Sequence, residues 1–186
     1  MSMNTRCLCL ALVAFLTSCQ SLDPAAPYTC GPPARQAQCV TVIMASRSDD
    51  ALAKQFAPAP HDKARLYIVR PYTIEPTIKT EVAMDGNAVA ELAPRTYLMF
   101  DIDPGEHRLQ MRTNALANAT MQFSAGQTYF IAHDLTQFFN TVVGRIKVLD
   151  PGSGQRLVRS SQRVAMPNVP VSLTASPEEA FHANTR

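Results

Sequence analysis

The stretch of sequence that decides the fold begins with Ala64-Arg65-Leu66-Tyr67-Ile68-Val69-Arg70 and continues as far as His133. Its first segment is rich in β-branched and aromatic residues, and it is apolar on both faces after its first two residues. Pro71 ends this segment, because proline has no N–H to donate to a neighbouring strand. A short run of this kind predicts a central strand that is covered on both sides.

Tight turns separate the segments that follow. The strongest turn signal is Asp85-Gly86, which lies between the segments Thr80–Met84 and Asn87–Leu92. Both turn residues tolerate the positive φ angles of a short hairpin, so these segments are predicted to pair. Asp103-Pro104-Gly105-Glu106 predicts another turn, in which proline presets φ and glycine adopts the unusual backbone angle.

Polar and apolar residues alternate in the segments between the turns. After the Pro-Gly turn, one face carries His107, Leu109 and Met111, and the other face carries Arg108, Gln110 and Arg112. This alternation predicts a strand with one exposed face. Roughly six such strands at about ten-residue spacing, without helical periods between them, predict a mainly β fold, either an antiparallel β-sandwich or a small barrel.

The regions that flank the sheet carry weaker signals. A short N-terminal helix is predicted over 48–56, with Ser48 as its cap, and we expect it to close one side of the sheet; a helix that binds a partner is the alternative. Residues 142–149 predict a further strand, and Asp150-Pro151-Gly152-Ser153-Gly154 predicts a turn or loop. Residues 160–186 predict a flexible tail, either disordered or ordered by a partner.

The amino terminus predicts export and lipidation. One positive charge in the first six residues precedes about ten apolar residues, too few to span a bilayer but typical of a signal peptide. Leu16-Thr17-Ser18-Cys19 resembles the bacterial lipobox, which implies cleavage before Cys19 and attachment of lipid to it. An ordinary secretory peptide or a cytosolic chain is the alternative. Gln20, in place of aspartate, favours the outer membrane by the same resemblance.

Two cysteines follow the predicted lipidation site. Residues 20–33 are rich in proline, alanine and serine, as expected of a tether. Cys30 and Cys39 form an even pair in an oxidising compartment, so a structural disulfide is favoured over free or differently paired thiols. The sequence nearby offers no further ligands for a zinc site, and no cofactor is predicted.

Several segments together resemble a bacterial lipoprotein family known only as a domain of unknown function. The likeness covers roughly residues 45–150. It implies an Ig-like or PEGA-like β-sandwich on a lipid tether, and it brings no catalytic residues. The segments that carry it are Ala53-Lys54-Gln55-Phe56, Ala64–Arg70 with Pro71, Val82-Ala83-Met84-Asp85-Gly86, Thr96–Ile102, Pro104-Gly105-Glu106-His107 and Ala125-Gly126-Gln127-Thr128-Tyr129-Phe130.

Residues that could carry chemistry are few. His107 is interpreted as a ring at the edge of the core that bonds a turn carbonyl. His133 is interpreted as part of a strand end, where its neighbour Asp134 points to the opposite face. The sequence contains no nucleophile elbow, zinc-protease helix or phosphate loop. A periplasmic hydrolase that uses His107 or His133 is therefore the alternative rather than the first hypothesis.

The distribution of charge along the chain argues against one class of partner and suggests another. The formal net charge of +2 is spread without a basic block, so nucleic-acid binding has no electrostatic support. Arg108, Gln110 and Arg112 form a modest strip, either a solvated face or a contact for an anionic partner.

The leading hypothesis is a non-enzymatic, outer-membrane lipoprotein that faces the periplasm and binds an envelope protein or peptidoglycan. A structural or stress-related envelope protein that contacts peptidoglycan or lipid directly is a further alternative. Its predicted parts are a signal peptide over 1–18, a lipidated cysteine and linker over 19–44, a β-sandwich over 45–159 and the tail over 160–186.

Overall fold

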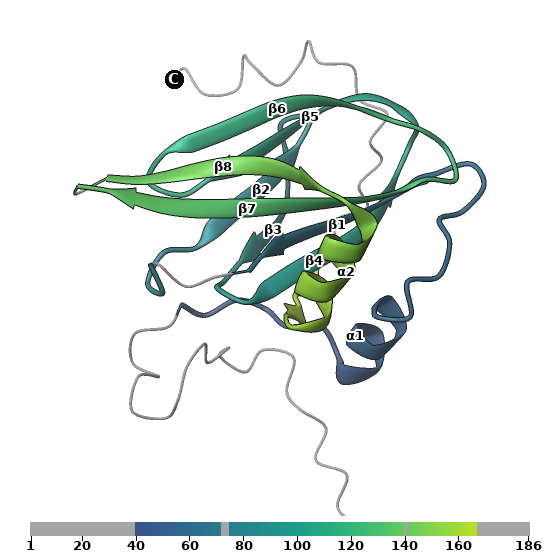
Figure 1. Ribbon diagram of the computed structural model, residues 1–186, viewed down its shortest axis with the longest axis horizontal. Coiled ribbons are helices and arrows are strands. Elements are labelled where there is room, and N and C mark those ends of the chain that lie inside the picture. Colours follow the sequence, from purple (N-terminus) through teal and green to yellow (C-terminus); the bar gives the residue numbers. More distant parts are fainter. Residues whose placement is uncertain (1–39, 72–74, 140, 167–186) are drawn as a thin grey trace, which may run out of the picture.

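The computed structural model describes residues 40–71, 75–139 and 141–166. These residues form two β-sheets and two short helices, so the fold is mainly β and sandwich-like (Figure 1). Cys19, Cys30 and Cys39 lie outside the described residues, as do the predicted signal peptide and most of the predicted C-terminal tail. In the described ranges, no helix combines the length and the hydropathy that crossing a membrane requires.

The first sheet has the strand order β8-β7-β1-β4-β9. Its middle strand β1 (Ala64–Arg70) pairs antiparallel with β4 (Thr96–Ile102) and parallel with β7 (Thr128–Phe138). The edges are β8 (Thr141–Leu149) and the short β9 (Gln162–Arg163), which runs parallel to β4. The prediction of a purely antiparallel sandwich was therefore wrong for this sheet. Parallel pairing needs a long connection, and the chain supplies one between β1 and β7.

That connection contains the whole second sheet, whose strand order is β3-β2-β5-β6. Every pair in this sheet is antiparallel, as predicted. Asp85 and Gly86 join the first two strands of this sheet with φ angles of 52° and 82°, which confirms the predicted hairpin. The four strands are β2 (Thr80–Met84), β3 (Asn87–Leu92), β5 (Gly105–Arg112) and β6 (Leu116–Phe123).

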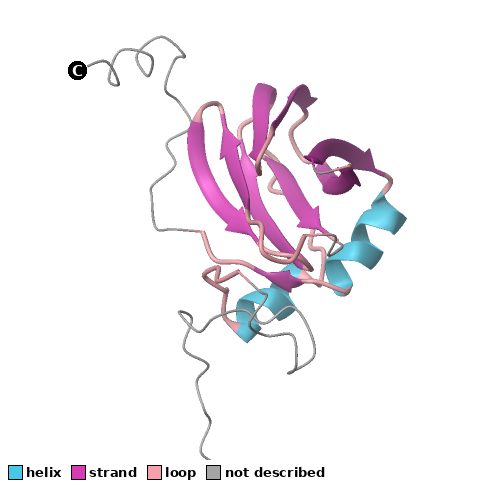
Figure 2. Cartoon of the chain, turned by 90° about the vertical axis from the view of Figure 1, so that its left-hand side faces the viewer, coloured by secondary structure: helices cyan, strands magenta, loops and turns pink. Residues whose placement is uncertain are grey.

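The main core lies between the two sheets, and a second core lies under the helices. In β1, Leu66 and Ile68 face the second sheet, whereas Tyr67 and Val69 face the helices, so both faces are buried as predicted. Figures 1 and 2 show the helices together on the outer side of the first sheet. They are α1 (Arg47–Ala53) and α2 (Pro151–Arg159).

The two helices differ in detail from the predictions. In α1 the cap is Ser46, whose side chain accepts a hydrogen bond from the N–H of Asp49, rather than Ser48. Residues 150–154 begin α2 and do not form the predicted turn. Asp150 caps this helix, and a proline in its first turn is tolerated because the first N–H groups of a helix have no partner within it.

The folded region extends beyond both predicted boundaries. Val42 is part of the main core, although the linker was predicted to reach residue 44. Met44 forms an isolated bridge with Val164, which is also buried in that core. The predicted tail therefore begins too early, because β9 and Val164 belong to the folded region. Segments of one or two paired residues show no periodicity that a sequence pattern could reveal.

Candidate functional site

The strip of Arg108, Gln110 and Arg112 lies on the outer face of the second sheet, as the alternation predicted. Across the strands, Arg108 lies opposite Thr120 and Gln110 lies opposite Asn118. Arg112 is opposite Glu81 in register, with 3.9 Å between Nε and Oε2. Acidic residues including Glu106 share this face, so its charges are balanced. A solvated sheet face accounts for the strip better than a contact for an anionic partner does.

His107 joins two turns at one end of the sandwich. Its Nδ1 lies 2.6 Å from Oδ2 of Asp85 in the β2–β3 turn. Its Nε2 lies 2.9 Å from the backbone oxygen of Asp103 in the next turn. Both ring nitrogens are therefore occupied by partners within the protein. This geometry confirms the interpretation of His107 as a ring at the core edge that bonds a turn carbonyl.

His133 lies within β7 and not at a strand end, because the strand continues as far as Phe138. Its ring points into the sandwich, with 3.0 Å between Nδ1 and Oγ1 of Thr80. This hydroxyl–imidazole pair has the composition of a nucleophile and its base, but Thr80 is 0% exposed and His133 is 1% exposed. No substrate reaches groups at that depth. Burial, with a smaller contribution from the charge of Arg70, lowers the pKa of His133 to about 4.

Gly144 and Arg70 complete the surroundings of His133. A Cβ on Gly144 would overlap Nε2 of the imidazole, so the ring packs against the bare backbone of β8. Arg70 is fully buried, and its guanidinium donates to the carbonyl oxygens of Glu75 and Ile78. Burial lowers the pKa of Arg70 to about 10. The sequence analysis missed this structural role, and the one available signal was an arginine at the end of an otherwise apolar strand.

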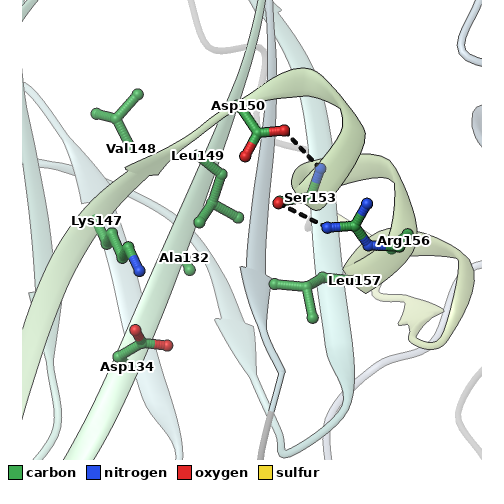
Figure 3. Close-up of a pocket in the computed structure, with 9 residues that line it drawn as sticks. All are labelled: Ala132, Asp134, Lys147, Val148, Leu149, Asp150, Ser153, Arg156 and Leu157. Atoms are coloured by element: carbon green, nitrogen blue, oxygen red, sulfur yellow. Dashed lines mark hydrogen bonds between the residues drawn. The ribbon is translucent and has the colours of Figure 1, made fainter.

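A cleft of about 360 Å³ lies on the opposite face of β7, where β8 leads into α2 (Figure 3). Its floor is apolar, and polar groups stand on both sides of it. On the strand side, Asp134 comes from β7 and Lys147 from β8; on the helix side stand Ser153 and Arg156. The full lining is Ala132, Asp134, Lys147, Val148, Leu149, Asp150, Ser153, Arg156 and Leu157.

The helix side of the cleft is held by local hydrogen bonds. Ser153 donates its backbone N–H to Oδ1 of Asp150 at 2.9 Å, and its hydroxyl accepts from Nη2 of Arg156 at 2.8 Å. The hydrogen bonds from Ser153 lower the pKa of Asp150, so its carboxylate stays charged while it caps the helix. Gly154 fixes α2 against the sheet, because a Cβ there would overlap the ring of Phe130.

The cleft was not predicted, because its helix was interpreted as a loop. Two signals for that helix are present in the sequence: Asp150 followed by proline, a pattern typical of a capped helix start, and Arg156 with Arg159 near the helix end. In the described part of the chain, no group of three or more histidine, cysteine, aspartate or glutamate side chains is arranged to hold a metal ion. The lining of the cleft consists of charged, polar and apolar side chains.

The stretch of the chain that matches a known family contains most of the strands but not the helix of the cleft. Residues 60–144 match a family described as "Protein of unknown function (DUF2846)". This stretch is similar to a domain of unknown function, as the sequence analysis expected, and it includes β1 to β7. It ends before α2 begins at Pro151. One wall of the cleft thus lies outside the matched stretch.

A relative of unknown function also matches part of the chain. An uncharacterized protein of Haemophilus influenzae is 30% identical over 94 residues, which are 50% of this chain and 56% of the relative. The match thus spans little more than half of that relative's length. No solved structure matches the chain.

Proposed function

We propose that the protein is a non-enzymatic binding module of the bacterial cell envelope, anchored in the outer membrane by lipid on Cys19 and facing the periplasm. The sequence Leu16-Thr17-Ser18-Cys19 supports the anchor. Two or three acyl chains hold a protein on a bilayer stably, because each buried methylene contributes about 0.8 kcal/mol. The resemblance to PEGA-type surface domains, and a disulfide between Cys30 and Cys39, belong to the same proposal.

The observation that carries the binding role is the cleft between β7, β8 and α2. It combines apolar side chains with charged groups on both sides, so a small molecule or peptide can make both kinds of contact there. By contrast, His107 has acceptors at both ring nitrogens, and His133 is inaccessible. Neither histidine offers the base that the alternative hypothesis, a periplasmic hydrolase, needs.

Tethering is the proposed mechanism. A lipid on Cys19 confines the folded domain near the membrane, so its effective concentration for an envelope target is high. A weak contact is then sufficient for occupancy. The proposed target is an envelope protein or peptidoglycan, and nucleic acid is not proposed.

The anchor predicts a clear effect of replacing Cys19. The variant Cys19→Ser lacks the sulfur that carries the lipid, so we expect it to leave the membrane fraction or to accumulate as an uncleaved precursor. Membrane flotation with an antibody to the folded domain measures this. Cys30→Ser is the matched control and should float as the native protein does. Flotation of Cys19→Ser at the native level would contradict the lipid anchor.

Crosslinking in intact cells, followed by mass spectrometry, tests the binding role on the natively anchored protein. We expect a specific envelope protein or peptidoglycan fragment that is lost when Arg156→Gln alters the cleft. A crosslinked component that is unchanged by every cleft variant would assign binding to another surface. Turnover of an envelope ester or amide by the purified protein would contradict the non-enzymatic role.

A further inference from the structure

We propose that the cleft between β7, β8 and α2 binds a small zwitterion: a ligand with an aliphatic body that carries both an ammonium group and a carboxylate. The chemistry is that of an amino acid or a short peptide with free ends. This inference rests on the proposed function, because it names the class of ligand that the binding module recognises.

The floor of the cleft selects the aliphatic body. Ala132 of β7, Leu149 of β8 and Leu157 of α2 lie between the two polar sides (Figure 3). Methylene groups placed on this floor leave water for an apolar surface, which is favourable. A ligand that is polar along its whole length gains nothing there and loses hydration.

Each side of the cleft carries one acidic and one basic side chain. Asp134 and Lys147 stand on the strand side, and Asp150 and Arg156 stand on the helix side. The formal charges of the lining therefore cancel. A polyanion or polycation finds as much repulsion as attraction, whereas a ligand with one charge of each sign pairs both.

The hydrogen bonds within the cleft indicate which groups bind which end. Asp150 caps α2 through the N–H of Ser153, so its carboxylate is already engaged. Asp134 is left as the acceptor for an ammonium group. Arg156 uses Nη2 toward the hydroxyl of Ser153, and the rest of its planar guanidinium suits a carboxylate. We assign Asp134 to the ammonium end and Arg156 to the carboxylate end.

The frame of the cleft is fixed before a ligand arrives. β8 leads directly into α2 through Asp150, so the two sides are separated by only a few residues of chain. The close contact between Gly154 and Phe130 then sets the position of the helix on the sheet. Such preorganisation reduces the ordering cost of binding a small ligand.

Three related probes test the ligand class. The full-length protein, purified in detergent micelles, is titrated with ε-aminocaproate, with adipate and with hexamethylenediamine, and binding is followed by calorimetry. The first probe has one ammonium and one carboxylate at opposite ends of an aliphatic chain, the second has only carboxylates and the third has only ammonium groups. We expect ε-aminocaproate to bind at least about tenfold more tightly than either of the others. Equal binding of adipate or hexamethylenediamine, or no binding of ε-aminocaproate, would overturn the proposal.

Matched variants assign the binding to the cleft. Asp134→Asn is a nearly isosteric replacement at a half-buried position, and Arg156→Gln keeps a polar side chain at an exposed position. Each replacement is expected to weaken binding about tenfold. Arg108→Gln is the control, because Arg108 lies on the outer face of the second sheet and does not line the cleft. An equal loss of affinity in the control would overturn the assignment. Crosslinking in cells is independent of these titrations, so a failed zwitterion site leaves the proposed binding function to be judged on its own.

Discussion

Replacing Gly154 with alanine is expected to lower the free energy of unfolding by about 3 kcal/mol. The added Cβ would overlap the ring of Phe130, and the ring is itself packed among Tyr67 and Phe56 with centroid distances of 5.0 and 6.0 Å. Neither the backbone of α2 nor this aromatic cluster can move without losing contacts. Urea denaturation followed by circular dichroism measures the change.

The same helix provides the control for this prediction. A Cβ on Gly152 would meet Oδ1 of Asp150 at 3.4 Å and Nη1 of Arg156 at 3.8 Å, which are ordinary contacts. Gly152→Ala should therefore change stability by less than about 1 kcal/mol. Equal effects of Gly152→Ala and Gly154→Ala would contradict the close-packing argument.

Acidification is expected to destabilise the protein through His133. Burial lowers the pKa of this histidine from 6.5 to about 4. Between these two pH values the imidazole is protonated in the unfolded chain but neutral in the folded chain. Stability that is present above about pH 6.5 is thus lost progressively as the pH falls toward 4. The contribution of His133 should be about 2 kcal/mol between about pH 7.5 and pH 5, measured as the shift in urea unfolding free energy.

A non-titrating variant isolates this contribution from that of the carboxylates. His133→Gln keeps a polar side chain near Thr80 but removes the titration, so its stability should depend less on pH by the same amount. The comparison is made between the two pH profiles, because the variant is also expected to be less stable at every pH. Parallel profiles for the two proteins would show that His133 is not responsible.

Local sequence patterns were sufficient to predict one hairpin and one half-exposed strand of the second sheet. The Asp85-Gly86 turn and the alternation around His107 depend on neighbours a few residues away, and both were confirmed. In β1, the apolar run predicted correctly that Tyr67 as well as Leu66 would be buried. Such features follow from backbone angles and from the two-residue period of a strand.

What was missed depends on distant partners. The parallel pairing of β1 with β7 leaves no mark on either segment, because a buried strand has the same composition in either orientation. Gly154 was interpreted as a turn residue, whereas the structure needs its lack of a side chain for contact with Phe130. The candidate cleft was missed for the same reason, since its helix wall depends on that contact.

The position of β1 between β4 and β7 also has a consequence for the order of folding. Leu66 is paired with Phe100 on one side and with Tyr129 on the other. One edge of β1 therefore stays unpaired until β7, a much later part of the chain, is in place. The β2–β3 hairpin closes locally and should form first, because contacts between distant residues are slow to form. Pulsed hydrogen exchange during refolding should therefore protect the amides of the hairpin before those of β1 and β7. A chain that emerges from a translocation pore amino terminus first would hold its most apolar strand incomplete until the last third of the domain has followed.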